Sequence, residues 1–250
     1  MDQAVTLTVA DGVGHIQLNR PEAANTIDMD LARALGEAAV AAGDDEAVRA
    51  VLLSGAGKRF CGGGDIASFA ESDDPGADLL ALADAADGAV LALEALDKPV
   101  VTAVHGAVAG GGLGIMLAGD VVVAAEGTKF VFAYPAIGLT PDCGTSTALP
   151  LTMGRQRALA FALRDQPLSA QEAREQGLVA EVVADPLARA RKLAAAWARG
   201  SSAAYGQTRR LLRAGADRPR TQSGRDEADT LGRRAGTPEA QALFAKFLGR

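Results

Sequence analysis

The chain has 250 residues, of which 48% are hydrophobic and only 4% are aromatic, and its formal net charge is −6. This length allows one large domain, or a core with an appendage, whose interior must consist mostly of Ala, Val and Leu. The acidic charge argues against general nucleic-acid binding, because that function needs a basic surface.

The predicted elements begin with a β-hairpin around Asp11-Gly12 and then alternate between strands and helices. In chain order, we expect strands at 5–9 and 13–18, a helix through Leu31, Leu35 and Ala38, a strand at 48–53, a helix at 79–96, a strand at 100–104 and a helix at 113–118. This alternation is typical of an α/β domain.

Three further helices are expected in the C-terminal part, at 187–199, 203–214 and 239–248, with a break at Arg218-Pro219-Arg220. Arginines concentrate in the same part of the chain. For most of them we favour a solvated helical face over contact with a phosphate-bearing ligand or another subunit. They are Arg209, Arg210, Arg213, Arg218, Arg220 and Arg225.

Two glycine clusters each lie where a predicted strand gives way to a helix. The first is Phe60-Cys61-Gly62-Gly63-Gly64-Asp65-Ile66, and the second runs from His105 to Gly114 with a glycine triplet at 110–112. Either cluster alone would be an ordinary turn. However, the start of a helix presents unpaired N–H groups. One such N–H from each cluster, converging on a single carbonyl oxygen, would form an oxyanion hole.

The cysteine and histidine content favours a reduced protein without a metal site. Cys61 and Cys143 form no disulfide framework and are typical of a reducing cytoplasm, and a nucleophilic role for either would need an activating partner. His15 and His105 lie in or at the end of predicted strands, where we expect structural roles, and zinc-like spacing is absent. The chain start lacks a signal-peptide pattern and no apolar stretch reaches membrane-spanning length, so we expect a cytoplasmic protein without membrane contact.

Five segments in order resemble the crotonase superfamily, also called the enoyl-CoA hydratase/isomerase family. They are Leu18-Asn19-Arg20-Pro21, Phe60 to Ile66, Lys98 to Gly114, Asp120 to Ala125 and Leu168 to Val179. The resemblance extends from about Val5 to Val183 and is looser from Ala184 to Arg250.

The resemblance implies an α/β fold, namely a crotonase-like spiral of ββα repeats with a C-terminal helical trimerisation region. We divide the chain into an acyl-CoA-binding core at 1–185 and a helical extension at 186–250. A homotrimer or a dimer of trimers is expected, although packing of the extension on its own core is a competing explanation. The apolar residues of the extension that need burial are Leu211, Leu212, Leu243, Phe244 and Phe247.

The resemblance also implies which residues bind an acyl-CoA thioester. The backbone N–H groups of Gly64 and Gly111 match the oxyanion donors that stabilise a thioester enolate. The segment that lines the thioester corresponds to Gly62, Gly64, Asp65 and Ile66, and the loop that meets the nucleotide corresponds to Ala23, Ala24 and Thr26. For the Asp65 side chain we favour an N-cap role. Coenzyme A would enter as part of the substrate, so no separate cofactor is expected.

The chain departs from the hydratase pattern at both catalytic glutamates. Gly114 stands at one of these positions, and Ala136, after the retained Pro135, stands at the other. Asp142 is the replacement candidate, because a carboxylate here resembles the base of isomerases that act on ring-derived acyl-CoA intermediates. As a turn residue after Pro141, Asp142 has an alternative local explanation. Tyr134 either shapes the acyl pocket by packing, which we favour, or donates a hydrogen bond.

The first functional hypothesis is therefore an enoyl-CoA isomerase in which Asp142 is the base. The alternatives are another enzyme of the family, such as a hydratase-type lyase, a hydrolase or a dehalogenase, and a non-catalytic acyl-CoA-binding protein. The aspartate also resembles the nucleophile of 4-chlorobenzoyl-CoA dehalogenase. That enzyme needs a histidine upstream of the glycine triplet and a tryptophan before the aspartate, whereas 76–97 contains no histidine and Tyr134 stands at the tryptophan position.

Overall fold

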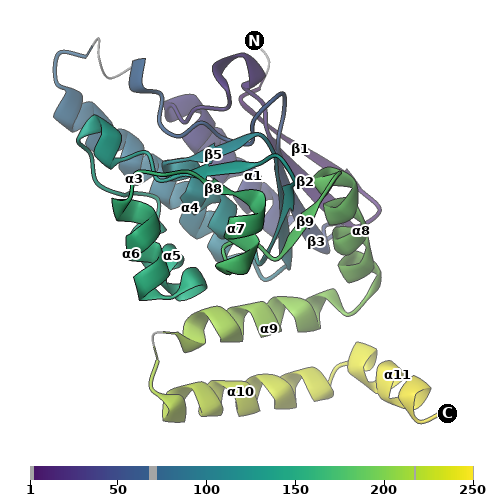
Figure 1. Cartoon of the computed structure of the whole chain (residues 1–250). Helices are drawn as coiled ribbons and strands as arrows, with labels where there is room; N and C mark the ends of the chain where they lie inside the picture. The colour runs from purple at the N-terminus through teal and green to yellow at the C-terminus, as the bar shows by residue number, and fades with distance from the viewer. Residues whose placement is uncertain (1–2, 68–71, 217, 250) are drawn as a thin grey trace.

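A computed structural model describes residues 3–67, 72–216 and 218–249, and a six-stranded sheet forms its centre (Figure 1). Across the sheet, the strands are β1 (Val5–Ala10), β2 (Val13–Leu18), β3 (Ala50–Gly55), β4 (Val100–Val104), β6 (Val121–Ala125) and β9 (Glu181–Val183). Only β1 and β2 pair antiparallel, as the hairpin predicted; the later pairs are parallel. The predicted hairpin and the strand at 100–104 are confirmed, and β3 begins two residues later than predicted.

Side chains of the central strands alternate between two cores, as the two-residue period of a strand requires. In β3, Val51 and Leu53 join the larger core, which includes helices α1 (Met29–Asp44) and α3 (Pro75–Glu94). Ala50 and Leu52 point the other way and pack with α8 (Pro186–Arg199) through its alanines at 190, 194 and 198. Both faces of the parallel sheet are therefore covered by helices. Because α8 covers one face, it packs with the core even though it lies beyond residue 185.

A second, three-stranded sheet carries the two glycine clusters. It consists of β5 (Ala107–Ala109), β7 (Lys129–Val131) and β8 (Leu168–Ser169). Cys61 forms a parallel bridge with Val108 of β5, which joins the first cluster to the strand that leads into the second. The chain then enters α4 (Gly111–Leu117), two residues earlier than predicted. The remaining helices of the body are α5 (Thr145–Met153), α6 (Arg155–Leu163) and α7 (Ala170–Glu175).

The C-terminal helices form an arm below the body (Figure 1). They are α9 (Ser202–Gly215), α10 (Arg220–Ala235) and α11 (Pro238–Phe247). The expected helices at 203–214 and 239–248 are confirmed. The sequence analysis missed α10, however, because it took Pro219 as a break. Pro219 is the N-cap residue, immediately before the helix begins at Arg220.

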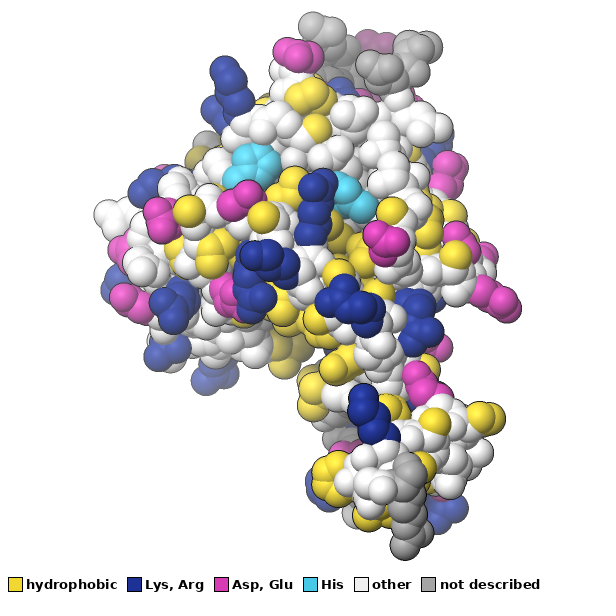
Figure 2. Space-filling model, turned by 90° about the vertical axis from the view of Figure 1, so that its right-hand side faces the viewer, with side chains coloured by type: hydrophobic (Ala, Val, Ile, Leu, Met, Phe, Trp, Pro, Cys, Tyr) yellow, Lys and Arg dark blue, Asp and Glu magenta, His cyan; other side chains and the backbone are white. Residues whose placement is uncertain are grey.

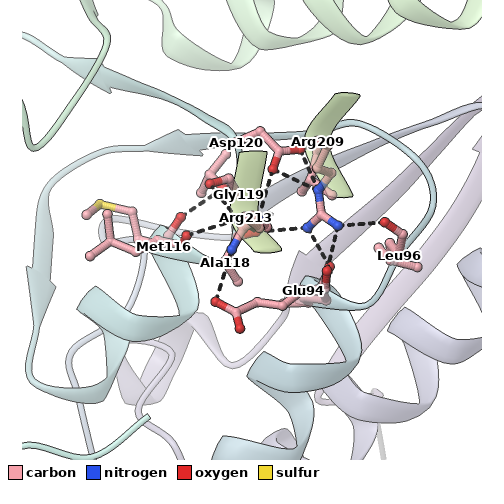
Figure 3. A network of polar contacts seen from close by, with 12 residues as sticks. Glu94, Leu96, Met116, Ala118, Gly119, Asp120, Arg209 and Arg213 are labelled. Atoms are coloured by element: carbon pink, nitrogen blue, oxygen red, sulfur yellow. Dashed lines mark hydrogen bonds and ion pairs between the residues drawn. The ribbon is translucent and has the colours of Figure 1, made fainter. Parts of the chain in front are cut away.

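Arg209 anchors α9 to the body and is not part of a solvated face (Figure 3). Its side chain is only 4% exposed, and its Nε lies 2.7 Å from Asp120 Oδ1. The other guanidinium nitrogens donate to main-chain oxygens of Leu93, Glu94 and Leu96 at 2.6–2.8 Å. Arg213 adds a 3.1 Å ion pair with Glu94. The expectation of solvated arginines is thus wrong for Arg209, where the ends of α3 and α4 offer unpaired carbonyls and a carboxylate.

The far end of the arm exposes large apolar side chains. Figure 2 shows this lobe projecting from the body, with apolar side chains on its surface. The exposed apolar residues here are Leu231, Leu243, Phe244, Phe247 and Leu248, and Phe247 reaches 90% exposure. Leu212 on α9, beside the body, is exposed as well. By contrast, Leu211 is half-buried against its own chain. Among the described residues, none of the helices is long and apolar enough to cross a membrane.

Candidate active site

Two of the predicted binding segments are tied together by main-chain hydrogen bonds. Gly62 N donates to Ala24 O at 3.0 Å, Ile27 N donates to Gly63 O at 2.7 Å, and Asp65 N donates to Ile27 O at 3.0 Å. The loop that contains Ala23, Ala24 and Thr26 therefore lies directly beside the segment that contains Gly62 to Ile66. Gly63 can follow this path because its φ of +94° is readily adopted only by glycine.

Asn25 fixes this loop, and the sequence analysis did not single it out. Its buried side-chain amide donates to Ala56 O and Arg59 O, both at 2.8 Å, and its Oδ1 accepts from Arg20 N at 2.8 Å. Its φ of +53° lies in the left-handed region that asparagine tolerates better than most residues. An asparagine just after Ala23-Ala24 was the available signal, but its partners are 31 and 34 residues away.

The Asp65 side chain is held by the same loop. Its Oδ2 accepts from Thr26 Oγ1 at 3.3 Å and lies 3.4 Å from Arg20 Nη2. Arg20 also pairs with Asp28 at 2.7 Å, so one arginine links both carboxylates. The N-cap role expected for Asp65 concerns the helical residues 66–67, and the chain that follows them, 68–71, lies outside the described residues. The side chain of Ile66 is exposed.

The N–H groups of the two predicted oxyanion donors are unpaired in the described part of the chain. The parallel bridge between Ile27 and Gly64 uses the neighbouring Gly63 O and Asp65 N, so the Gly64 N–H points away from Ile27. Gly111 is the first residue of α4, where an N–H has no partner within the helix. Within the described part of the chain, neither N–H has a hydrogen-bond acceptor. Such unpaired donors can stabilise a developing oxyanion.

Asp142 lies next to Gly111, which brings the third predicted catalytic residue to the same place. A Cβ built on Gly111 would be 3.3 Å from Asp142 Oδ1 and 3.1 Å from Cys143 Sγ. The hydroxyl of Tyr134 donates to Asp142 Oδ1 at 2.6 Å. Thus a carboxylate, a phenol and the start of α4 share one site.

The turn that carries Asp142 leaves no room for a side chain at position 114, to which the family resemblance assigns the first hydratase glutamate. A Cβ built on Gly114 would lie 2.7 Å from Cys143 Cβ and 3.0 Å from its carbonyl carbon, with the carbonyl oxygen closer still. Real Cβ atoms do not approach other atoms this closely, so no side chain fits at this position with the turn in place. The other departure, Ala136, lies exposed in a short 3₁₀ helix, Pro135–Ile137.

The buried thiols and phenol around Asp142 remain protonated near neutral pH. Burial raises the pKa of Cys61 to about 12. Burial, and then the charge of Asp142, likewise raise the pKa values of Cys143 and Tyr134. Neither thiol is therefore an activated nucleophile, and Tyr134 is a donor and not a base. Among the described residues, no cluster of three or more His, Cys, Asp or Glu side chains could hold a metal ion.

Tyr134 packs against a neighbouring aromatic ring and also donates a hydrogen bond, and these are the two roles considered in the sequence analysis. Its ring meets Phe132 edge-on at a centroid distance of 5.0 Å, and Phe132 meets Phe161 at 6.1 Å. These aromatic contacts leave Tyr134 only 6% exposed. The ring therefore has little freedom to move its hydroxyl away from Asp142.

Comparisons with known proteins agree with this fold. The family model described as "Enoyl-CoA hydratase/isomerase" matches residues 8–243. A 1,2-epoxyphenylacetyl-CoA isomerase of Escherichia coli is 39% identical over 71% of this chain and 68% of its own length. A "Probable enoyl-CoA hydratase" of Rhodobacter capsulatus is 36% identical over 84% of this chain and 81% of its own length. The crystal structure of a Mycobacterium abscessus protein assigned as an enoyl-CoA hydratase/isomerase superposes with a TM-score of 0.94 at 37% identity, covering 98% and 96% of the two chains.

The chain therefore belongs to the enoyl-CoA hydratase/isomerase family and has the crotonase fold. Its relatives include both isomerases and hydratases, so membership alone does not define the reaction.

Proposed function

We propose that this protein is an enoyl-CoA isomerase in which Asp142 moves a proton between two carbons of the acyl group. The observation that carries the proposal is the position of the Asp142 carboxylate beside Gly111, the residue whose N–H is available to an oxyanion. A base next to an oxyanion donor suits proton abstraction from the carbon adjacent to a thioester carbonyl.

The proposed reaction needs one carboxylate and no water. Asp142 takes a proton from C2 of a 3-enoyl-CoA, and the electrons of the broken C–H bond pass to the thioester oxygen. The N–H groups of Gly64 and Gly111 stabilise the resulting dienolate. The protonated carboxyl then returns the proton to C4, and the double bond now joins C2 and C3. Atoms and charge balance, and Asp142 ends as it began.

The lack of a carboxylate at either of the two hydratase positions favours isomerisation over hydration. Hydration needs groups that position and activate a water, and the two family positions for these groups are Gly114 and Ala136. The turn at Cys143 fills the space beside Gly114. The isomerase name of the Escherichia coli relative is consistent with this proposal, whereas the name of the Rhodobacter capsulatus relative favours the hydratase alternative.

The coenzyme A part of the substrate would lie along the two tied segments. We place the thioester against Gly62, Gly64, Asp65 and Ile66, and the nucleotide side near Ala23, Ala24 and Thr26. The hydrogen bonds between Gly62 and Ala24 and between Asp65 and Ile27 hold these segments in a fixed relation. The exposed side chain of Ile66 offers apolar surface to a ligand.

A panel of 2-enoyl-, 3-enoyl- and aryl-acyl-CoA thioesters, incubated in deuterated solvent and analysed by mass spectrometry, tests the function. We expect the 3-enoyl substrate to yield its 2-enoyl isomer without the added mass of water, with deuterium incorporated only where the protonated Asp142 exchanges with solvent before it returns the proton. Addition of the mass of water would indicate a hydratase, and loss of coenzyme A would indicate a hydrolase. Binding without turnover across the panel would indicate a non-catalytic acyl-CoA-binding protein.

We also propose a homotrimer, or a dimer of trimers, assembled around the C-terminal arm. A groove of about 1040 Å³ lies between α3, α5 and α9, and its lining includes the exposed side chains of Leu91, Leu151 and Leu212. Apolar surface of this kind on a folded chain favours a protein contact. In this arrangement Phe244 and Lys246 of α11 would approach the coenzyme A bound to a neighbouring subunit.

A further inference from the structure

The two carboxylate oxygens of Asp142 have different surroundings. Oδ1 accepts the hydrogen bond from the Tyr134 hydroxyl at 2.6 Å. No N–H or O–H group in the described ranges donates to Oδ2, and the thiol of Cys143, a weak donor, is the other hydrogen-bonding group at the carboxylate. Oδ1 is thus held by the phenol, whereas Oδ2 has no N–H or O–H donor in the described ranges.

We propose that Tyr134 is a positioning residue that holds Oδ1 of Asp142, so that Oδ2 takes up and returns the substrate proton. This inference rests on the proposed isomerase function. Tyr134 itself exchanges no proton with the substrate: its hydroxyl remains the donor throughout, and the proton moves from C2 to Oδ2 and from Oδ2 to C4.

The packing of Tyr134 fixes the direction of its hydrogen bond. The ring is 6% exposed and lies edge-on against Phe132, which in turn contacts Phe161 of α6. The only other hydroxyl near the phenol oxygen among the described residues is that of the buried Thr145, at 3.5 Å. At this distance Thr145 competes poorly with Asp142, because a good O–H···O bond is about 2.5–3.0 Å long.

Few other titratable groups face Asp142 from the elements around it. Burial raises the pKa of the Cys61 thiol, and burial followed by Asp142 raises that of Cys143, so both remain neutral. Asp87 on α3 is the other carboxylate whose charge reaches this turn, and it lines the same groove as Gly144. None of these three groups changes when Tyr134 loses its hydroxyl.

The test compares Tyr134→Phe with Tyr205→Phe, because these are the two tyrosines of the chain. Tyr205 lies on α9, is 45% exposed and contacts Trp197, remote from Asp142 in the fold. For Tyr134→Phe we expect kcat to fall by about ten-fold or more, with KM within about two-fold of the wild type. Tyr205→Phe should behave as the wild type.

An unchanged kcat in a folded Tyr134→Phe protein would overturn the inference and leave Tyr134 with a packing role only. Asp142→Asn separates this failure from that of the proposed function. If Asp142→Asn is inactive while Tyr134→Phe resembles the wild type, only the positioning role is wrong. If Asp142→Asn keeps full activity, the proposed function itself is wrong.

A second measurement avoids dependence on the folding of Tyr134→Phe. Wild-type protein labelled with ¹³C at the phenol carbon of tyrosine should give two resonances, one for each tyrosine. Asp142→Asn should shift the Tyr134 resonance and leave the Tyr205 resonance in place. Absence of a shift at Tyr134 would contradict the hydrogen bond on which the inference rests.

Discussion

Replacement of Gly114 by alanine tests whether the turn at Asp142 depends on close contact with α4. The new Cβ would lie 2.7 Å from Cys143 Cβ, and the carbonyl oxygen of Cys143 would be closer still. Ordinary contact between carbon atoms is about 3.5 Å, so the turn must retreat by roughly 0.8 Å, and by more along the carbonyl. Asp142 precedes Cys143 and would move with it.

The expected effects follow from this displacement. Misplacement of a catalytic group by about 1 Å can lower the rate by a factor of ~10². We therefore expect kcat/KM of Gly114→Ala to fall about 100-fold towards a 3-enoyl-CoA. Overpacking of a buried contact should cost about 1–3 kcal/mol of unfolding free energy. Binding of coenzyme A should change little, because its proposed contacts lie on 23–27 and 62–66.

Gly88→Ala is the matched control for this experiment. Gly88 also lies within a helix, α3, but no atom lies within 4 Å of a Cβ built there. Alanine should stabilise this helix by up to about 1 kcal/mol and leave turnover unchanged. Steady-state kinetics and urea unfolding of both variants provide the comparison. A Gly114→Ala enzyme with wild-type kcat/KM would refute the coupling between α4 and the Asp142 turn.

Four further predictions concern stability and assembly. Arg209→Ala should lower the unfolding free energy in urea by about 3–5 kcal/mol, because Asp120 and several carbonyls lose their partner; a loss below about 1 kcal/mol would contradict this. Burial, and then the charge of Arg191, lower the pKa of His15, so its contribution to stability should be present above about pH 6.5 and decrease below it. His15→Gln should flatten the pH dependence of the unfolding free energy between about pH 7 and pH 5. An unchanged slope would show that His15 does not contribute to this dependence. Asn25→Ala should lower the unfolding free energy by about 1–3 kcal/mol, because the carbonyl oxygens of Ala56 and Arg59 lose their donor. An unchanged unfolding free energy would show that these oxygens do not need the amide. Light scattering should give at least a trimeric mass, whereas a monomeric mass at micromolar concentration would exclude the proposed assembly.

Much of the fold could be predicted because its signals are local. The hairpin at Asp11-Gly12 follows from its turn residues, and both central residues have positive φ. The strand at 100–104 is marked by a short apolar run after Pro99. The start of β3 was predicted two residues too early, because 48–55 is apolar over most of its length and buried at both ends, so the sequence has no clear boundary signal.

The C-terminal arm was harder to predict because long-range contacts stabilise it. Helix α10 has one buried residue, Thr230, and its sequence has no clear apolar stripe. Ion pairs connect it to α9, including that between Arg210 and Asp226 at 2.7 Å. Arg209 likewise resembles any exposed arginine in the sequence. Its burial depends on Asp120, 89 residues earlier, and on the ends of two other helices.

The candidate site contains residues that the sequence indicates and contacts that only the folded chain creates. The glycine clusters could be selected from their local pattern, whereas Asp142, whose local pattern is that of a turn residue, was selected through the resemblance to the family. The contact between Gly114 and Cys143 could not be predicted, because it depends on how the turn folds back over α4. The hydrogen bond between Tyr134 and Asp142 was one of two alternatives for this tyrosine, and its geometry depends on the packing of Phe132 and Phe161.

The most direct test of the proposed mechanism is the isomerisation of a 3-enoyl-CoA by wild-type protein and by Asp142→Asn, followed as formation of the 2-enoyl product. The substitution keeps the shape of the side chain and removes its ability to accept a proton. We predict turnover by the wild type and a loss of at least about 10²-fold in the folded variant, which should still bind the thioester. Full activity of Asp142→Asn would contradict the account.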